Sequence, residues 1–102
     1  MDNLNIISFN CRGINNSGKR KKVFQYLKKK KANIYCLQDT HFTSEQEQLI
    51  KQEWGYKHCY VNFHKSNSRG TAILFNNNFA FKIKRILYDE INGNYTALDI
   101  SV

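Results

Sequence analysis

The sequence predicts an α/β domain with two helices and a mixed sheet, and specifically one half of a sandwich. Two apolar runs flank a basic amphipathic segment near the N-terminus, which indicates a strand, a helix and a second strand. A capped helix follows this unit. The rest of the chain is typical of strands joined by turn-forming residues, so helices would cover only one side of the sheet.

The first unit is a strand–helix–strand crossover. Residues 5–10 are rich in β-forming side chains and end in a turn, Asn-Cys-Arg-Gly. Residues 19–31 place their apolar side chains on one helical face, and either Asn16 or Ser17 is in position to cap the helix. Residues 32–37 are almost continuously apolar, as in a strand buried on both faces. A crossover of this length joins parallel strands.

A second helix is predicted to begin soon after the second strand. Its start is a capping box, formed by Thr43 with Gln46 or by Ser44 with Glu47. Gly55 follows the last apolar residue of this segment, and glycine is a common C-terminal stop. We therefore expect the helix to end just before Gly55.

The remaining chain predicts four strands, at residues 58–63, 70–75, 79–84 and 96–102. A polar loop at residues 65–68 separates the first two, and Asn92-Gly93 is a strong hairpin signal. Residues 79–84 alternate between apolar and polar, which indicates a half-exposed strand. Strands linked in this way would form one broad sheet with a bare apolar second face. Because the sequence stops inside an alternating strand, we expect a truncated domain.

Size and composition indicate a packed domain, or part of one. The chain has 102 residues, of which 41% are hydrophobic and 14% aromatic. No apolar stretch approaches the roughly 20 residues that span a bilayer, and no secretory signal is visible. The three cysteines are widely spaced and fit no standard zinc motif or disulfide framework. We therefore expect an intracellular protein, in the nucleus or the cytoplasm.

The charge of the chain is strongly positive. Sixteen Lys and Arg against eight Asp and Glu leave a net charge of +8. Half of the basic residues lie in two blocks, residues 19–22 and 28–31. This pattern favours a polyanionic partner, most commonly nucleic acid, although a solvated helix face would have the same composition.

A short polar segment with ionisable side chains follows the buried second strand. The second strand stops at Gln38, Asp39, Thr40 and His41, so an acid and an imidazole lie at its tip. Two interpretations compete for this segment. It is either an ordinary strand-to-helix turn or the metal-binding corner of an enzyme.

Three stretches of sequence resemble a known family: IISFNCRGINNSGKRKKVFQYLKKKKANIYCLQDTHFT, GYKHCYVNF and SRGTAILFNNNF. In this order and at these separations they are similar to the opening of an endonuclease/exonuclease/phosphatase domain, most of all the apurinic-endonuclease-like domain of LINE-type (non-LTR) retrotransposons. The resemblance covers residues 5–102. It implies a four-layered α/β sandwich of the deoxyribonuclease I type, of which residues 1–102 would be the N-terminal half.

The resemblance implies divalent-metal hydrolysis of DNA phosphodiester bonds, with Mg²⁺ or Mn²⁺ as cofactor. Asn10 and Asp39 correspond to the family's catalytic asparagine and glutamate beside the metal. Hard oxygen ligands of this kind suit Mg²⁺. Asp39 departs from the family's Glu and is shorter by one methylene, about 1.5 Å. Gln38 is expected to support the site, whereas His41 is expected to have a turn or packing role.

Four basic residues are candidates for binding nucleic acid. Arg12 and Arg69 lie in loops at the expected active face, where they would contact DNA phosphate. Lys19 and Arg20 open the basic helix, and charge alone makes them candidates.

The resemblance also implies what this stretch lacks. The family's catalytic His, its partner Asp and further metal-binding residues come from the second half, so residues 1–102 alone are expected to be inactive. In a full-length LINE-type protein a reverse transcriptase domain would follow. Two alternatives remain: a non-catalytic basic module that binds nucleic acid through its helix, and a phosphatase of the same superfamily.

Overall fold

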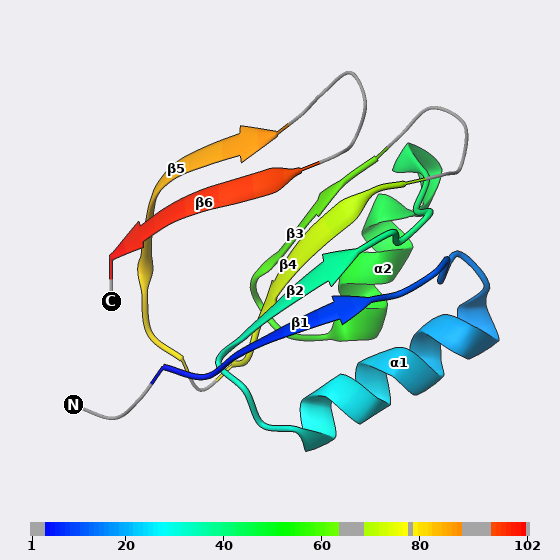
Figure 1. The fold of residues 1–102 in the computed structure, drawn as a ribbon, viewed down its shortest axis with the longest axis horizontal. Helices are drawn as coiled ribbons and strands as arrows, with labels where there is room; N and C mark the ends of the chain where they lie inside the picture. Colours follow the sequence, from blue (N-terminus) through cyan, green and yellow to red (C-terminus); the bar gives the residue numbers. More distant parts are fainter. Residues whose placement is uncertain (1–3, 64–68, 78, 89–94, 102) are drawn as a thin grey trace.

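The computed structural model describes residues 4–63, 69–77, 79–88 and 95–101. In chain order the elements are β1 (Ile6–Asn10), α1 (Ser17–Lys29), β2 (Ile34–Gln38), the 3₁₀ turn η1 (Ser44–Gln46), α2 (Glu47–Trp54), β3 (Cys59–Asn62), β4 (Thr71–Phe75), β5 (Lys82–Tyr88) and β6 (Thr96–Ser101) (Figure 1). The predicted polar loop at residues 65–68, the Asn92-Gly93 turn and Val102 lie outside the described residues.

Four of the strands form a mixed sheet in the order β1-β2-β4-β3. β1 and β2 are parallel, as the crossover predicts, and Asn10 lies opposite Gln38. β4 is antiparallel to β2 and pairs Thr71 with Gln38. The last residues of β1 and β2 and the first residue of β4 therefore meet at one end of the sheet.

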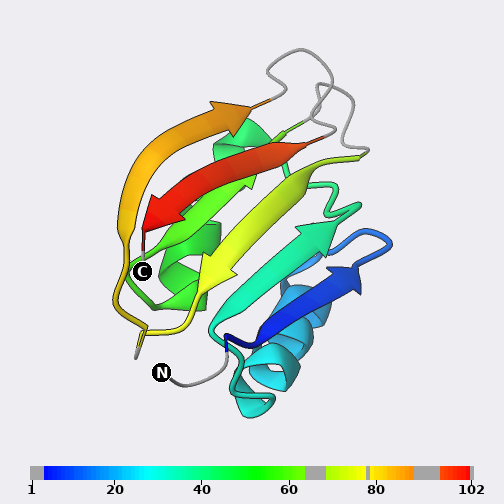
Figure 2. The ribbon, with the colours of Figure 1, turned by 60° about the vertical axis from the view of Figure 1, so that its left-hand side comes forward.

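The last two strands do not join this sheet, so the prediction of one broad sheet was wrong. β5 and β6 pair with each other as a separate two-stranded sheet. Figure 2 shows this pair in front of the main sheet, on the face opposite the helices. The Phe81 ring stacks on Phe75 with centroids 4.0 Å apart, and the hydroxyls of Thr71 and Thr96 lie 2.7 Å apart. Through this stacking, the segment that leads into β5 packs on the face of the main sheet, so β5 does not pair with an edge strand of that sheet.

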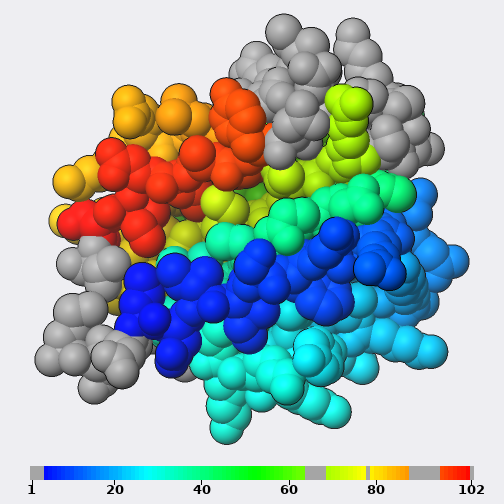
Figure 3. All heavy atoms as spheres, in the orientation of Figure 1, coloured from blue at the N-terminus to red at the C-terminus, as the bar shows by residue number. Residues whose placement is uncertain are grey.

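The bare face predicted for the sheet is thus only half covered. The β5–β6 pair contacts β3 and β4. β1 forms one edge of the sheet, and Ile6 is 56% exposed. In the space-filling view the atoms of β1 run uncovered across the molecule (Figure 3).

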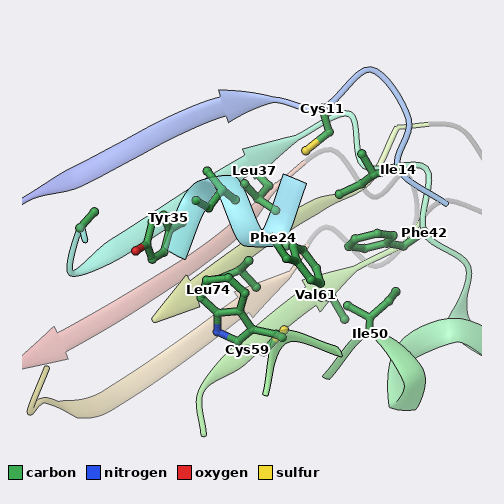
Figure 4. Packing of buried hydrophobic residues seen from close by; sticks show 14 residues of the cluster. Cys11, Ile14, Phe24, Tyr35, Leu37, Phe42, Ile50, Cys59, Val61 and Leu74 are labelled. Atoms are coloured by element: carbon green, nitrogen blue, oxygen red, sulfur yellow. The ribbon is translucent and has the colours of Figure 1, made fainter. Parts of the chain in front are cut away.

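The hydrophobic core lies between the helices and the sheet (Figure 4). Trp54 of α2 is fully buried, and its ring meets Phe24 of α1 and Tyr35 of β2 edge to face at 5.4 and 5.3 Å. Its indole Nε1 donates a hydrogen bond of 3.2 Å to the carbonyl oxygen of Phe75. One residue thus joins both helices to the sheet, and edge-to-face aromatic pairs add to the stability that burial supplies.

Both predicted helices are present, but α1 spans Ser17–Lys29 instead of residues 19–31, and the capping box opens the 3₁₀ turn η1 that leads into α2. Asn16 caps α1, since its Oδ1 accepts a hydrogen bond of 3.1 Å from the backbone of Lys19. The capping box at residue 43 uses Thr43 with Gln46, whose Oε1 accepts from the Thr43 backbone at 3.1 Å. α2 ends at Trp54, and Gly55 caps it, as expected. Within the described ranges, neither helix has the length and apolar character that would let it cross a membrane.

Candidate active site

Three loops meet at the end of the sheet where β1 and β2 finish and β4 begins. They comprise residues 10–14, residues 38–41 and residues 69–70, which together we call the strand-end frame. Backbone hydrogen bonds join these loops: Cys11 N to Gln38 O, Gly13 N to Asp39 O and Ile14 N to Thr40 O, each 2.8 Å, then Thr40 N to Gly70 O at 3.1 Å and His41 N to Arg69 O at 2.7 Å. Main-chain bonds therefore hold the loops around Asp39.

Unusual backbone conformations are concentrated in the strand-end frame. Of the five non-glycine residues with positive φ in the described chain, four lie here, namely Arg12, Asp39, His41 and Arg69 with φ between 51° and 61°. Each such conformation costs about 1–3 kcal/mol, and such strain tends to cluster at functional sites. The clustering points to this end of the sheet as the functional one.

Two glycines allow the loops to approach this closely. A Cβ atom on Gly70 would lie 2.6 Å from the Thr40 Oγ1, and one on Gly13 would lie 2.7 Å from the His41 Nδ1. Both glycines also have φ near +90° (92° and 84°), where an L side chain is strained. The imidazole of His41 therefore packs directly against the backbone of Gly13.

Asp39 and His41 form a direct contact at the centre of the frame. The Nε2 of His41 lies 2.7 Å from the Oδ1 of Asp39, and the side chains are 32% and 42% exposed. The sequence predicted a turn or packing role for His41, and the structure adds a hydrogen bond to the candidate carboxylate. The sequence carried no local signal for this contact, because both Asp39 and His41 have positive φ angles (54° and 61°).

Asn10 and Gln38 lie opposite each other on β1 and β2. The Oδ1 of Asn10 accepts a hydrogen bond of 3.2 Å from the backbone of Arg12, which orients the exposed amide at the start of the frame. Gln38 Nε2 donates to the Ser8 Oγ and the Cys36 carbonyl, both at 3.0 Å. Gln38 thus links β1 to β2 behind the frame.

Three of the four predicted basic residues are exposed at the frame. Arg12 and Arg69 belong to its loops, and both are exposed. Lys19, at the start of α1, donates from Nζ to the carbonyl oxygen of Arg12 at 3.3 Å. These exposed basic residues therefore come from three separate segments, the loops at residues 10–14 and 69–70 and the start of α1.

Arg20 is a correction to the predicted set, because it is buried rather than available to a phosphate. Its side chain is 1% exposed, and its Nε donates to the carboxylate of Glu53 on α2. Its Nη1 also donates to the carbonyl oxygens of Ile14 and Asn15, at 3.2 and 2.9 Å. Arg20 thus ties α1 to α2 and to the loop that leaves β1.

The oxygen donors at the frame fit magnesium better than zinc. The described residues contain no group of three or more His, Cys, Asp or Glu side chains arranged around a metal ion. One carboxylate and one amide suit Mg²⁺, which keeps several waters and needs only one or two carboxylates. Burial raises the pKa of the neighbouring Cys11 thiol to about 12.

The strand-end frame lies within the part of the chain that matches a known family. The model of the endonuclease/exonuclease/phosphatase family matches residues 7–97, which include the whole strand-end frame. The chain belongs to the endonuclease/exonuclease/phosphatase family, so the resemblance is confirmed at this level. The observed two helices and mixed sheet fit the predicted half of a deoxyribonuclease I-like sandwich. Membership indicates a hydrolase of the nuclease or phosphatase type, and such enzymes generally use divalent metals.

Proposed function

We propose that this chain supplies the first half of the active site of a LINE-type endonuclease, which nicks target DNA with Mg²⁺ or Mn²⁺. The observation that carries the proposal is the Asp39 carboxylate, oriented by His41 inside the strained strand-end frame. Asn10 lies at the end of the adjacent parallel strand. The net charge of +8 favours DNA over a small phosphoester as substrate.

In this proposal Asp39 holds the metal and Asn10 supports it without adding negative charge. A bound Mg²⁺ would polarise a phosphoryl oxygen and stabilise charge on the leaving group. His41 engages Oδ1 of Asp39, and no other described side chain is hydrogen-bonded to that carboxylate. The imidazole therefore holds the carboxylate while its second oxygen stays available as a ligand.

The basic residues of the frame would position the DNA backbone. Arg12 and Arg69 are exposed on two loops that flank Asp39, and Lys19 is bonded to the first of these loops. Guanidinium groups form bidentate hydrogen bonds with phosphate, which orients the strand as well as attracting it. The remaining catalytic residues, and a reverse transcriptase domain, would come from further parts of a LINE-type protein.

Metal binding at Asp39 is the most direct test. In an amide ¹H–¹⁵N NMR titration of the chain, we expect Mn²⁺ to broaden the signals of residues 10–12 and 39–41 before the others, because paramagnetic broadening is local. Asp39→Asn should abolish this selectivity. Asp99→Asn is a matched control, since Asp99 is exposed on β6 and the charge change is the same. Selective broadening that survives in Asp39→Asn would contradict the assignment.

A second expected result concerns His41 as a positioning residue. His41→Ala should weaken Mn²⁺ affinity in the same titration by about 10- to 100-fold, as is typical when a group that orients a ligand is removed. His41→Gln should restore part of the loss, because its amide can donate to Asp39. A purely structural role would instead lower thermal stability in both variants and leave the affinity of the folded protein unchanged.

A further inference from the structure

A basic surface on α1 is not used by the candidate active site. Residues 17–31 contain seven lysines and no acidic residue. The ion pairs of the described residues are Arg20–Glu53, His41–Asp39 and Lys51–Glu47, so none of these seven lysines has an acidic partner there. Because Glu53 is engaged by the buried Arg20, it does not neutralise the exposed lysines.

The outward face of α1 is defined by which residues it buries. Phe24, Leu27 and Arg20 face the core. Lys22, Gln25 and Lys29 are exposed at spacings of three and four residues, so they form one stripe along the opposite face. Two helical turns separate the two lysines of the stripe, about 10 Å along the axis.

Further lysines flank this stripe, and one of them carries an aromatic partner. Lys21 is exposed on one side of the stripe. On the other side Tyr26 is 50% exposed, and the Nζ of Lys30 lies 5.0 Å from the centroid of its ring. Lys28 differs, because its Nζ lies over the rings of Trp54 and Tyr56 at 5.0 and 4.5 Å and so contributes to packing. We call Lys21, Lys22, Lys29 and Lys30 the lysine face.

We propose that the lysine face is a second nucleic-acid contact, which binds the phosphate backbone of duplex DNA without reading its sequence. Clustered lysines that lack acidic partners attract polyanions and release counterions on binding. The face lies along the length of α1, while Lys19 at the helix start is bonded to the strand-end frame. The positive surface therefore continues from the candidate active site along the helix.

The surroundings and composition of the lysine face argue against a membrane surface or another protein as its partner. A helix that lies in a membrane surface buries a broad apolar face in the lipid, whereas the apolar side of α1 packs against the sheet. Protein interfaces are depleted in lysine at their centres. A duplex presents one charge per about 1.7 Å, so a 13-residue helix about 20 Å long faces several phosphates at once.

The test compares two double variants of the full chain that remove equal charge. Binding of a fluorescent duplex of about 20 base pairs is measured by anisotropy at several salt concentrations, with EDTA present so that no hydrolysis or metal binding contributes. For Lys22→Gln/Lys29→Gln we expect the slope of log K against log salt to fall by about 1.8, which is 0.9 for each lost phosphate contact. Affinity at about 0.1 M salt should fall roughly tenfold. Lys82→Gln/Lys84→Gln, on exposed positions of β5, should change the slope by less than about 0.5.

Two results would overturn the proposal. Equal losses in both double variants would mean that net charge alone attracts DNA and that α1 has no special role. Tighter binding to phosphatidylserine vesicles than to the duplex at the same salt, lost in Lys22→Gln/Lys29→Gln, would assign the face to a membrane. Unchanged circular dichroism of the variants shows that a loss of binding reflects the surface and not the fold. Because EDTA removes the metal, failure of the proposed endonuclease function would leave these outcomes unaffected.

Discussion

Asp39→Asn is expected to lower Mg²⁺-dependent nicking of supercoiled plasmid by about 100-fold or more, because the variant keeps the shape of the side chain but loses its charge. The assay uses a domain that carries residues 1–102 together with the later catalytic residues of the family. The substituted amide would also present a neutral group to His41, whose Nε2 lies 2.7 Å from the Oδ1 of Asp39 in the native chain. The measured quantity is the rate at which open-circular plasmid appears.

Two comparisons make this result specific. Asp99→Asn carries the same charge change on exposed β6 and should nick within about twofold of the parent domain, as surface changes away from a site usually have small effects. Undiminished nicking by Asp39→Asn would remove Asp39 from the metal site. Hydrolysis of a small phosphomonoester without plasmid nicking would favour the phosphatase alternative.

Glu53→Ala is expected to lower the free energy of unfolding by about 3–5 kcal/mol, because it leaves the buried guanidinium of Arg20 without its counter-ion. Small domains have total stabilities of about 5–15 kcal/mol, so this is a large share. Urea denaturation followed by the fluorescence of the buried Trp54 measures the loss.

Controls separate the buried charge from other effects of the substitution. Glu47→Ala, on the same helix, breaks an exposed pair with Lys51 and should cost less than about 1 kcal/mol. Replacing both buried partners, as Arg20→Met with Glu53→Leu, should recover much of the loss, since apolar replacements of buried pairs are often neutral. A loss below about 1 kcal/mol for Glu53→Ala would show that Arg20 is satisfied by the carbonyl oxygens alone.

The strand–helix–strand unit was predictable because its signals are local. Hydrophobic period and capping residues define β1, α1 and β2, and the length of the crossover dictates their parallel pairing. The separate β5–β6 pair was not predictable in this way. It depends on Phe81 meeting Phe75, a contact between segments that only the folded chain brings together. A register shift between Ile83 and Arg85 also interrupts the expected alternation within β5.

The candidate site was predictable in part for a similar reason. Parallel strands end at the same edge of a sheet, so the strand predictions place the ends of residues 5–10 and 32–37 together, while the family resemblance is what singles out Asn10 and Asp39. The burial of Arg20 also had a signal, because residues 20, 24 and 27 share one helical face. The surrounding run of basic residues obscured that signal. The contact of His41 with Asp39 depends on two positive φ angles, which no local pattern predicts.

The construction of the strand-end frame determines which substitutions the fold would tolerate during evolution. Its loops are joined by main-chain atoms, and its tight approaches require glycine at two positions. The acid at position 39 contributes its side chain to none of these main-chain bonds. A substitution there alters the chemistry while the architecture survives, whereas a substitution of Gly70 damages the architecture first. A descendant that had lost the carboxylate of residue 39 would therefore be expected to keep the same fold.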